Sequence, residues 1–89
     1  MLERWTARAR QDYEWFVANR PELAVRVETL LDAIRKDPFR GPGKPEPLKL
    51  EFAGWWSRRI DREHRLVYRV SGRNHRTLEI AQCRFHYAR

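Results

Sequence analysis

The sequence predicts an α+β fold with the element order β-α-α-β-β-β-β, in which a mostly antiparallel, twisted sheet carries an αα-hairpin on one face. Two observations support this fold class. Apolar residues recur at helical spacing in the first part of the chain, and beyond a loop rich in proline and glycine at residues 41–49 they alternate as in strands. A chain of 89 residues has room for one modest hydrophobic core, so residues 1–89 are expected to form a single domain.

The chain is expected to begin with a short strand at residues 2–5 and to continue as a helix. Thr6 is a suitable N-cap because its hydroxyl can accept a hydrogen bond from an amide of the first helical turn. Apolar residues then recur at helical spacing, at Ala9, Tyr13 and Phe16. This first helix is expected to end near residues 19–20.

A second helix is predicted to start at Pro21, where the missing N–H of proline costs nothing. Its apolar residues form a continuous stripe, made of Leu23, Val27, Leu30, Leu31 and Ile34. The Asp37-Pro38 pair ends the helix, since proline disfavours a helical conformation in the residue before it. The two helices are therefore expected to form a hairpin.

Four strands are predicted after the proline and glycine loop, with turn-forming residues between them. They are Leu48–Phe52, Trp55–Ile60, His64–Val70 and Thr77–Phe85. The apolar stripe of the helices is expected to pack on one face of the resulting sheet, which leaves the other face partly open.

The positive charge of the chain points to a polyanionic partner. Lys and Arg total 19 against 12 Asp and Glu, a formal net charge of +7 at pH 7, and most of this excess lies in residues 46–89. Neutralisation of phosphates by basic side chains supplies most of the sequence-independent affinity for nucleic acid, so RNA or DNA is the favoured partner. The simpler alternative is a charge that only keeps the protein in solution.

The cysteine content and the N-terminal sequence indicate a cytoplasmic protein. Cys83 is the only cysteine, so an internal disulfide is impossible and a reducing compartment is expected. The first residues, Met-Leu-Glu-Arg-Trp, lack the apolar run of a signal peptide, and no uncharged stretch is long enough to span a membrane.

One acidic residue stands out among the basic ones. Glu46 lies between Pro45 and Pro47, and each ring fixes its own φ near about −65° and disfavours a helical conformation in the residue before it. The carboxylate is therefore presented from a stiff, extended segment. Such a loop is typical of a functional site.

Two arginines are expected to lie opposite each other in the sheet. If residues 61–63 form a three-residue turn, Arg59 lies opposite Arg65 in an antiparallel pair, with Ser57 and Val67 on the same face. Like charges directly across a sheet destabilise it, so two arginines in these positions favour an anion between them. A register shift of one residue would send the two side chains to opposite faces.

The C-terminal residues bring two proton-transfer groups, His86 and Tyr87, to the end of the last strand. The other two histidines are expected to have a surface or packing role, because His75 lies in a predicted loop and His64 at the start of a strand. No pair of Cys or His residues has the spacing of a metal site, so neither a metal nor another cofactor is expected.

These residues match the needs of RNA cleavage through the 2′-hydroxyl, which are a base, cations around the phosphorane and an acid for the 5′-oxygen. The candidate roles are Glu46 as base, Lys49, Arg59 and Arg65 as cations, His86 as acid, and Tyr87 as the residue that orients the phosphate. For each residue alone a simpler reading exists: Glu46 could pair with Lys44 or Lys49, and the two arginines could be solvated strand residues.

Several segments carry a resemblance to a known family: Asp37-Pro-Phe-Arg-Gly41, Gly43-Lys-Pro-Glu-Pro-Leu-Lys49, Trp56-Ser-Arg-Arg-Ile60, Glu63-His-Arg-Leu-Val-Tyr68 and Cys83-Arg-Phe-His-Tyr87. In these the chain resembles the YoeB (Txe/YoeB) toxins of type II toxin–antitoxin systems, members of the RelE/ParE superfamily. The resemblance implies a RelE/ParE-like fold and a ribosome-dependent endoribonuclease that cuts messenger RNA in the decoding site. By position the family's catalytic set falls on Glu46, Lys49, Arg59, Arg65, His86 and Tyr87.

The same resemblance implies a cognate antitoxin of the YefM/Phd type and the possibility of a homodimer. A non-catalytic inhibitor of the same fold remains open as an alternative, acting on the ribosome or, as in ParE relatives, on DNA gyrase. A small basic RNA-binding module is less well supported, because Trp55, Trp56 and Phe85 belong to types that occur more often in cores and interfaces than as base-stacking surfaces.

Overall fold

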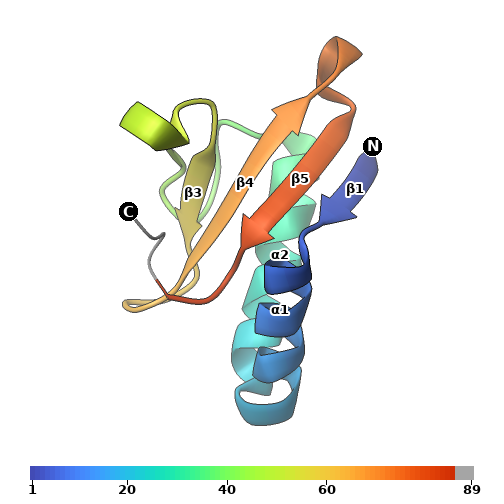
Figure 1. Cartoon of the computed structure of the whole chain (residues 1–89). Helices are drawn as coiled ribbons and strands as arrows, with labels where there is room; N and C mark the ends of the chain where they lie inside the picture. The colour runs from blue at the N-terminus through green and yellow to red at the C-terminus, as the bar shows by residue number, and fades with distance from the viewer. Residues whose placement is uncertain (86–89) are drawn as a thin grey trace.

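A computed structural model describes residues 1–85 of the chain. In this part of the chain five strands form one sheet, and two helices pack together on one of its faces, behind the sheet in Figure 1. The elements are β1 (Leu2–Trp5), α1 (Ala7–Asn19), α2 (Pro21–Lys36), β2 (Glu46–Pro47), β3 (Trp56–Arg59), β4 (Arg65–Ser71) and β5 (Thr77–Gln82), with 3₁₀ turns at Leu50–Phe52 and Arg73–His75.

The order of strands in the sheet is β1-β5-β4-β3-β2. All neighbouring pairs are antiparallel except β1 and β5, which run parallel. The predicted α+β class and the mostly antiparallel sheet are thus confirmed. The first strand of the chain closes one edge beside the last strand, as Figure 1 shows.

The N-terminus of α1 is capped as the sequence predicted. Thr6 Oγ1 accepts a hydrogen bond from the amide of Ala9 at 3.0 Å and donates one to the carbonyl of Ala81 at 2.7 Å. One hydroxyl therefore both starts the helix and attaches it to the end of β5.

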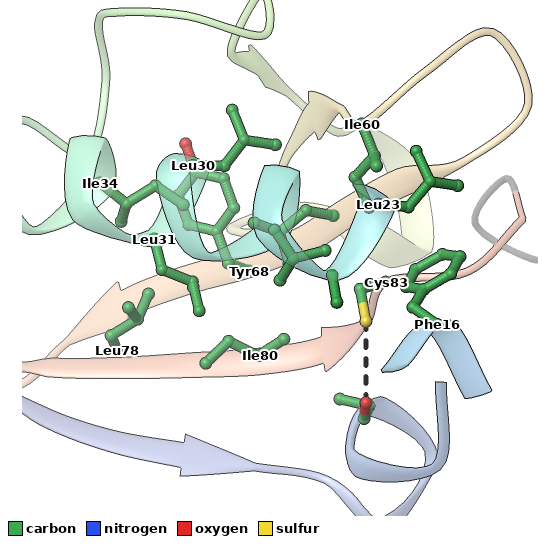
Figure 2. Close-up of a cluster of buried hydrophobic side chains, with 14 residues drawn as sticks. Phe16, Leu23, Leu30, Leu31, Ile34, Ile60, Tyr68, Leu78, Ile80 and Cys83 are labelled. Carbon is green, nitrogen blue, oxygen red and sulfur yellow. Dashed lines mark hydrogen bonds between the residues drawn. The ribbon is translucent and has the colours of Figure 1, made fainter. Parts of the chain in front are cut away.

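The core lies between α1, α2 and the inner face of the sheet (Figure 2). The predicted stripe of α2 is buried throughout, and α1 contributes Ala9 and Phe16. The sheet supplies the other half of the core with alternate residues, namely Leu66 and Tyr68 of β4 and Leu78 and Ile80 of β5. This alternation leaves the opposite face of the sheet to the remaining strand residues.

The strand predicted at Leu48–Phe52 is wrong. Only Glu46 and Pro47 pair with β3, and Leu50 to Phe52 form a 3₁₀ turn in which Leu50 has a φ of +58°. A left-handed residue cannot continue a strand, and the amides of Phe52 and Ala53 bond locally to the carbonyls of Lys49 and Leu50. The apolar residues of this run suggested a strand, but hydrophobic periodicity carries no information about φ and could not reveal the turn.

The last strand is shorter than predicted. β5 ends at Gln82, because the amide of Cys83 turns away from the sheet and donates to Asp12 Oδ2 at 3.1 Å. Cys83 and Arg84 therefore pack against α1, and the chain meets the sheet again at Phe85, beside the start of β4.

Candidate functional site

The predicted register between β3 and β4 is confirmed. Arg59 lies opposite Arg65 and Ser57 opposite Val67, and the amide of Ile60 donates to the carbonyl of His64 at 3.0 Å. Because facing residues of an antiparallel pair lie on the same side of a sheet, both arginines project from the face that the helices leave open.

β2 brings Glu46 to this same open face. Glu46 lies opposite Ser57, which in turn lies opposite Val67. The carboxylate therefore belongs to the row of side chains next to that of Arg59 and Arg65. Three of the residues singled out in the sequence, distant along the chain, are thus assembled on one surface.

The carboxylate of Glu46 is exposed and has no partner within residues 1–85. No ion pair joins it to Lys44 or Lys49, the simpler reading that the sequence left open. Glu46 and Lys49 both line an open pocket built by residues 46–52. A ligand in this pocket would meet a carboxylate and an ammonium group together.

The two arginines differ in how they are held. Arg65 is half-buried, and its Nη1 donates to the carbonyls of Asp61 at 2.9 Å and His64 at 3.1 Å. Arg59 is exposed, and no hydrogen bond or ion pair to another residue of the 1–85 region holds its guanidinium. One cation is therefore fixed in place, and the other is free to adjust to an anion.

The segment that leads to the predicted acid is fastened beside Arg65. The amide of Phe85 donates to His64 Nδ1 at 2.8 Å, and the amide of Arg65 donates to the carbonyl of Phe85 at 3.1 Å. Phe85, the last described residue, thus lies at the start of β4. His86 and Tyr87 themselves lie outside the described residues.

His64 has the packing role that the sequence suggested, and it also anchors this segment. Its side chain is buried and meets the ring of Phe16 edge-on, with centroids 5.1 Å apart. Its Nδ1 is the acceptor for the amide of Phe85, so the same ring both packs in the core and holds the end of the described chain. His75 is exposed in the turn before β5, as expected.

The turn between β3 and β4 is organised by Asp61. Its Oδ1 accepts hydrogen bonds from the amides of Glu63 at 2.9 Å and His64 at 2.7 Å. Burial alone would raise the pKa of this carboxyl, but the two amide hydrogen bonds, helped by nearby positive charge, outweigh it and lower the pKa. Arg62 is exposed in the same turn, away from the arginine pair.

Trp56, the first residue of β3, and Trp55 just before it pack against neighbouring residues rather than forming an open stacking surface. Trp56 packs against the core and meets Phe39 with centroids 5.0 Å apart. Trp55 is covered by the guanidinium of Arg69, 4.4 Å from the ring centroid. Arg69 also pairs with Glu79, and its hydrogen bond is the main cause of the lowered pKa of that carboxyl.

One residue with a clear structural role was missed in the sequence. Arg58, beside Arg59 in β3, is fully buried on the helix side and contacts the loop between α2 and β2. The confirmed register could have indicated it, because neighbours in a strand point to opposite faces.

Two general features of residues 1–85 bear on function. Within this range no three His, Cys, Asp or Glu side chains are grouped so that they could hold a metal ion. No helix in the same range has the length and apolar character needed to cross a bilayer.

A family described as "YoeB-like toxin of bacterial type II toxin-antitoxin system" matches residues 5–87. Together with the fold, this match defines the class of the protein, the small toxins of the RelE/ParE superfamily. The chain therefore belongs to the YoeB-like toxin family. A toxin YoeB of Synechocystis is 54% identical over 78 residues, covering 88% of this chain and 87% of the relative.

Solved structures of toxins share the whole fold. A YoeB/ParE toxin from Agrobacterium tumefaciens has a TM-score of 0.94 and 47% identity, with 98% of this chain and 100% of that chain covered. A YoeB dimer from Staphylococcus aureus has a TM-score of 0.88 and 36% identity, with 98% of each chain covered. The heterotetrameric YoeB-YefM complex from the same organism has a TM-score of 0.86 and 37% identity, with 98% and 99% covered.

Proposed function

We propose that this toxin is a ribosome-dependent endoribonuclease that cuts messenger RNA in the ribosomal A site and so stops translation. The observation that carries the proposal is the shared open face of the sheet, which presents Glu46 next to the facing pair Arg59 and Arg65. Membership of the YoeB-like toxin family supports the same conclusion. Action on ribosomes implies a cytoplasmic location.

The reaction needs no atom beyond those of the RNA and the side chains. Glu46 takes the proton of the 2′-hydroxyl, and the 2′-oxygen forms a bond to phosphorus while the bond from phosphorus to the 5′-oxygen breaks. His86 gives a proton to the departing 5′-oxygen. The products are a 2′,3′-cyclic phosphate and a 5′-hydroxyl.

Positive charge stabilises the phosphorane in this scheme. Arg65 is suited to the role because two backbone carbonyls already hold its guanidinium, so little reorganisation is needed during the reaction. Arg59 and Lys49 are exposed and bind phosphate oxygens, and Tyr87 orients the phosphate. The attachment of Phe85 beside Arg65 supports a role for the residues that follow it.

We further propose that an antitoxin of the YefM/Phd type restrains the toxin. The S. aureus relative forms a heterotetramer with YefM, and another structure of that protein is a dimer. A surface that carries Arg59, Arg65 and Lys49 is a natural receptor for an acidic segment that folds as it binds. We also propose that the present chain can form a homodimer, because the S. aureus relative does so.

The decisive experiment maps the 5′ ends and the end chemistry of messenger RNA cut in a purified translation mix. Wild-type protein should produce cuts within the A-site codon that leave 5′-hydroxyl ends. Glu46→Ala and His86→Ala should abolish cutting while ribosome binding stays largely intact, because each removes a proton-transfer group and leaves the basic surface in place.

Glu14→Ala and His75→Ala are matched controls, since both residues are exposed and lie outside the proposed site. Both should cut at the wild-type rate. If Glu46→Ala and His86→Ala also cut normally, the assignment of base and acid is wrong. If wild-type protein blocks translation without cutting, the chain is instead a non-catalytic inhibitor, acting on the ribosome or on DNA gyrase.

A further inference from the structure

The segment that carries Glu46 to the open face is held by hydrogen bonds from buried side chains and by one backbone hydrogen bond to β3. Between the end of α2 and Glu46, the carbonyls of Asp37, Arg40 and Pro42 accept hydrogen bonds from Arg58, at 2.7, 2.9 and 3.1 Å. The carbonyl of Pro38 accepts one from the hydroxyl of Tyr68 at 2.6 Å. This segment, residues 37–45, is called the glutamate loop below.

Arg58 is an unusual residue to find at a core position. Its side chain is fully buried, and a buried guanidinium is costly unless its N–H groups are satisfied. Those groups reach only neutral acceptors among the described residues: the three loop carbonyls through Nη1 and Nη2, and Tyr68 Oη through Nε at 3.0 Å. The planar fork of arginine can serve these acceptors together, which a single ammonium group cannot.

The glutamate loop also passes very close to Arg58. A Cβ atom added to Gly43 would lie 3.0 Å from Arg58 Cβ and 3.0 Å from Leu30 Cδ2, and Gly43 has a φ of +89°. The carbonyl of Gly43 accepts the amide of Arg59 at 2.6 Å. The loop is thus in close contact with β3 three residues before the carboxylate. Pro45 has a fixed φ, so the position of Gly43 restricts where Glu46 can lie.

We propose that Arg58, together with Tyr68, is a positioning residue for Glu46. The two neighbouring arginines of β3 divide their work by face: Arg59 projects to the substrate side, and Arg58 fixes the path of the glutamate loop from the core side. The distance from the carboxylate to the arginine pair is thereby set from beneath the sheet. This inference rests on the proposed function, because it assigns a role within that site.

The test uses Arg58→Lys, which keeps the positive charge and most of the aliphatic stem but loses the fork. We expect single-turnover cleavage on programmed ribosomes to slow about 10- to 100-fold, while the dissociation constant for the ribosome changes less than about threefold. Amide hydrogen exchange in the glutamate loop should accelerate, whereas exchange in α2 should be unchanged.

Tyr68→Phe provides a second variant that keeps the buried ring. It removes the hydroxyl that bonds Arg58 and Pro38, so it should give a smaller rate loss in the same direction. Combined with Arg58→Lys it should cost less than the product of the two single effects, because both act through one loop. Arg62→Lys is the matched control, as Arg62 is exposed in the turn after β3.

The outcomes separate this inference from the proposed function. A wild-type protein that cuts no messenger contradicts the proposed function. Wild-type cutting with undiminished rates for both Arg58→Lys and Tyr68→Phe overturns the positioning role and leaves the nuclease assignment standing. A loss of ribosome affinity equal to the loss of rate would also overturn it, because binding rather than positioning would then be affected.

Discussion

Three arginines of the sheet show how the same side chain serves different purposes. Arg58 is buried and bonded to carbonyls of the glutamate loop, Arg65 is half-buried and bonded to carbonyls of its own turn, and Arg59 is exposed. Backbone dipoles satisfy the first two cations without neutralising their charge. The net positive charge near Glu46 is therefore preserved for an anionic ligand.

At this scale the first prediction compares Arg65 with Arg62. Arg65→Ala should slow messenger cleavage far more than Arg62→Ala, by about 100-fold against less than about twofold, because only Arg65 faces Arg59 on the open side of the sheet. Single-turnover cleavage on programmed ribosomes measures both. Equal losses would contradict a role that depends on position and would indicate general electrostatic attraction.

Among the elements, β3 contributes most to the proposed site. Arg59 projects from its outer face, and Arg58, on its inner face, holds the glutamate loop. Its other edge pairs with β2, which is only two residues long and contains Glu46. Such a short strand has little intrinsic stability, so its placement depends on the loop before it and on the prolines that stiffen it.

The element-scale prediction concerns these prolines. Pro45→Ala combined with Pro47→Ala should slow cleavage by about tenfold although the carboxylate is intact, because each proline removes about 0.4–1 kcal/mol of backbone freedom. Pro21→Ala, at the exposed start of α2, should cut normally and serves as the control. An unchanged rate in the double variant would show that stiffness of this segment contributes nothing.

In the molecule as a whole, α1 packs both in the core and against the last described residues. Asp12 accepts the amide of Cys83, the ring of Trp15 lies 3.6 Å from the guanidinium carbon of Arg84, and Phe16 packs on His64. Cys83 Sγ also points to the carbonyl of Ala9, the dashed contact in Figure 2. The segment after β5 is thus part of the packed structure as far as Phe85.

The whole-molecule prediction concerns alkaline pH. Burial, with the charge of Asp12 acting in the same direction, raises the pKa of the Cys83 thiol from 9.0 to about 12. The native state keeps this proton where the unfolded chain loses it, so the free energy of unfolding falls as pH rises above 9.0. Relative to Cys83→Ala, wild-type protein should lose up to about 1.4 kcal/mol per pH unit.

Urea denaturation of both proteins at several pH values between about 8 and 11 gives this difference directly. The comparison is designed to cancel the effect of Tyr68, whose pKa is raised chiefly by burial. If the free energy of unfolding of the two proteins falls in parallel with pH, the thiol of Cys83 is not the cause of the loss.

Much of the fold could be predicted because its signals are local. Thr6 and Pro21 mark the helix starts, and the turn at residues 61–63 sets the register that brings Arg59 opposite Arg65. The strand at Leu48–Phe52 was wrong because the left-handed conformation of Leu50 leaves no trace in hydrophobic periodicity. The catalytic roles of Glu46, Lys49, Arg59, Arg65, His86 and Tyr87 stay predictions.

The order of most elements, the stiff setting of Glu46 and the register of the arginine pair can be predicted from the sequence alone, because each follows from neighbours within a few residues. Other features become visible only in the folded chain: β1 lies parallel to β5, Arg58 holds the glutamate loop from the core side, and Phe85 is bonded beside Arg65. These contacts join residues far apart in the chain. Their choice depends on how whole elements pack, which no local pattern encodes.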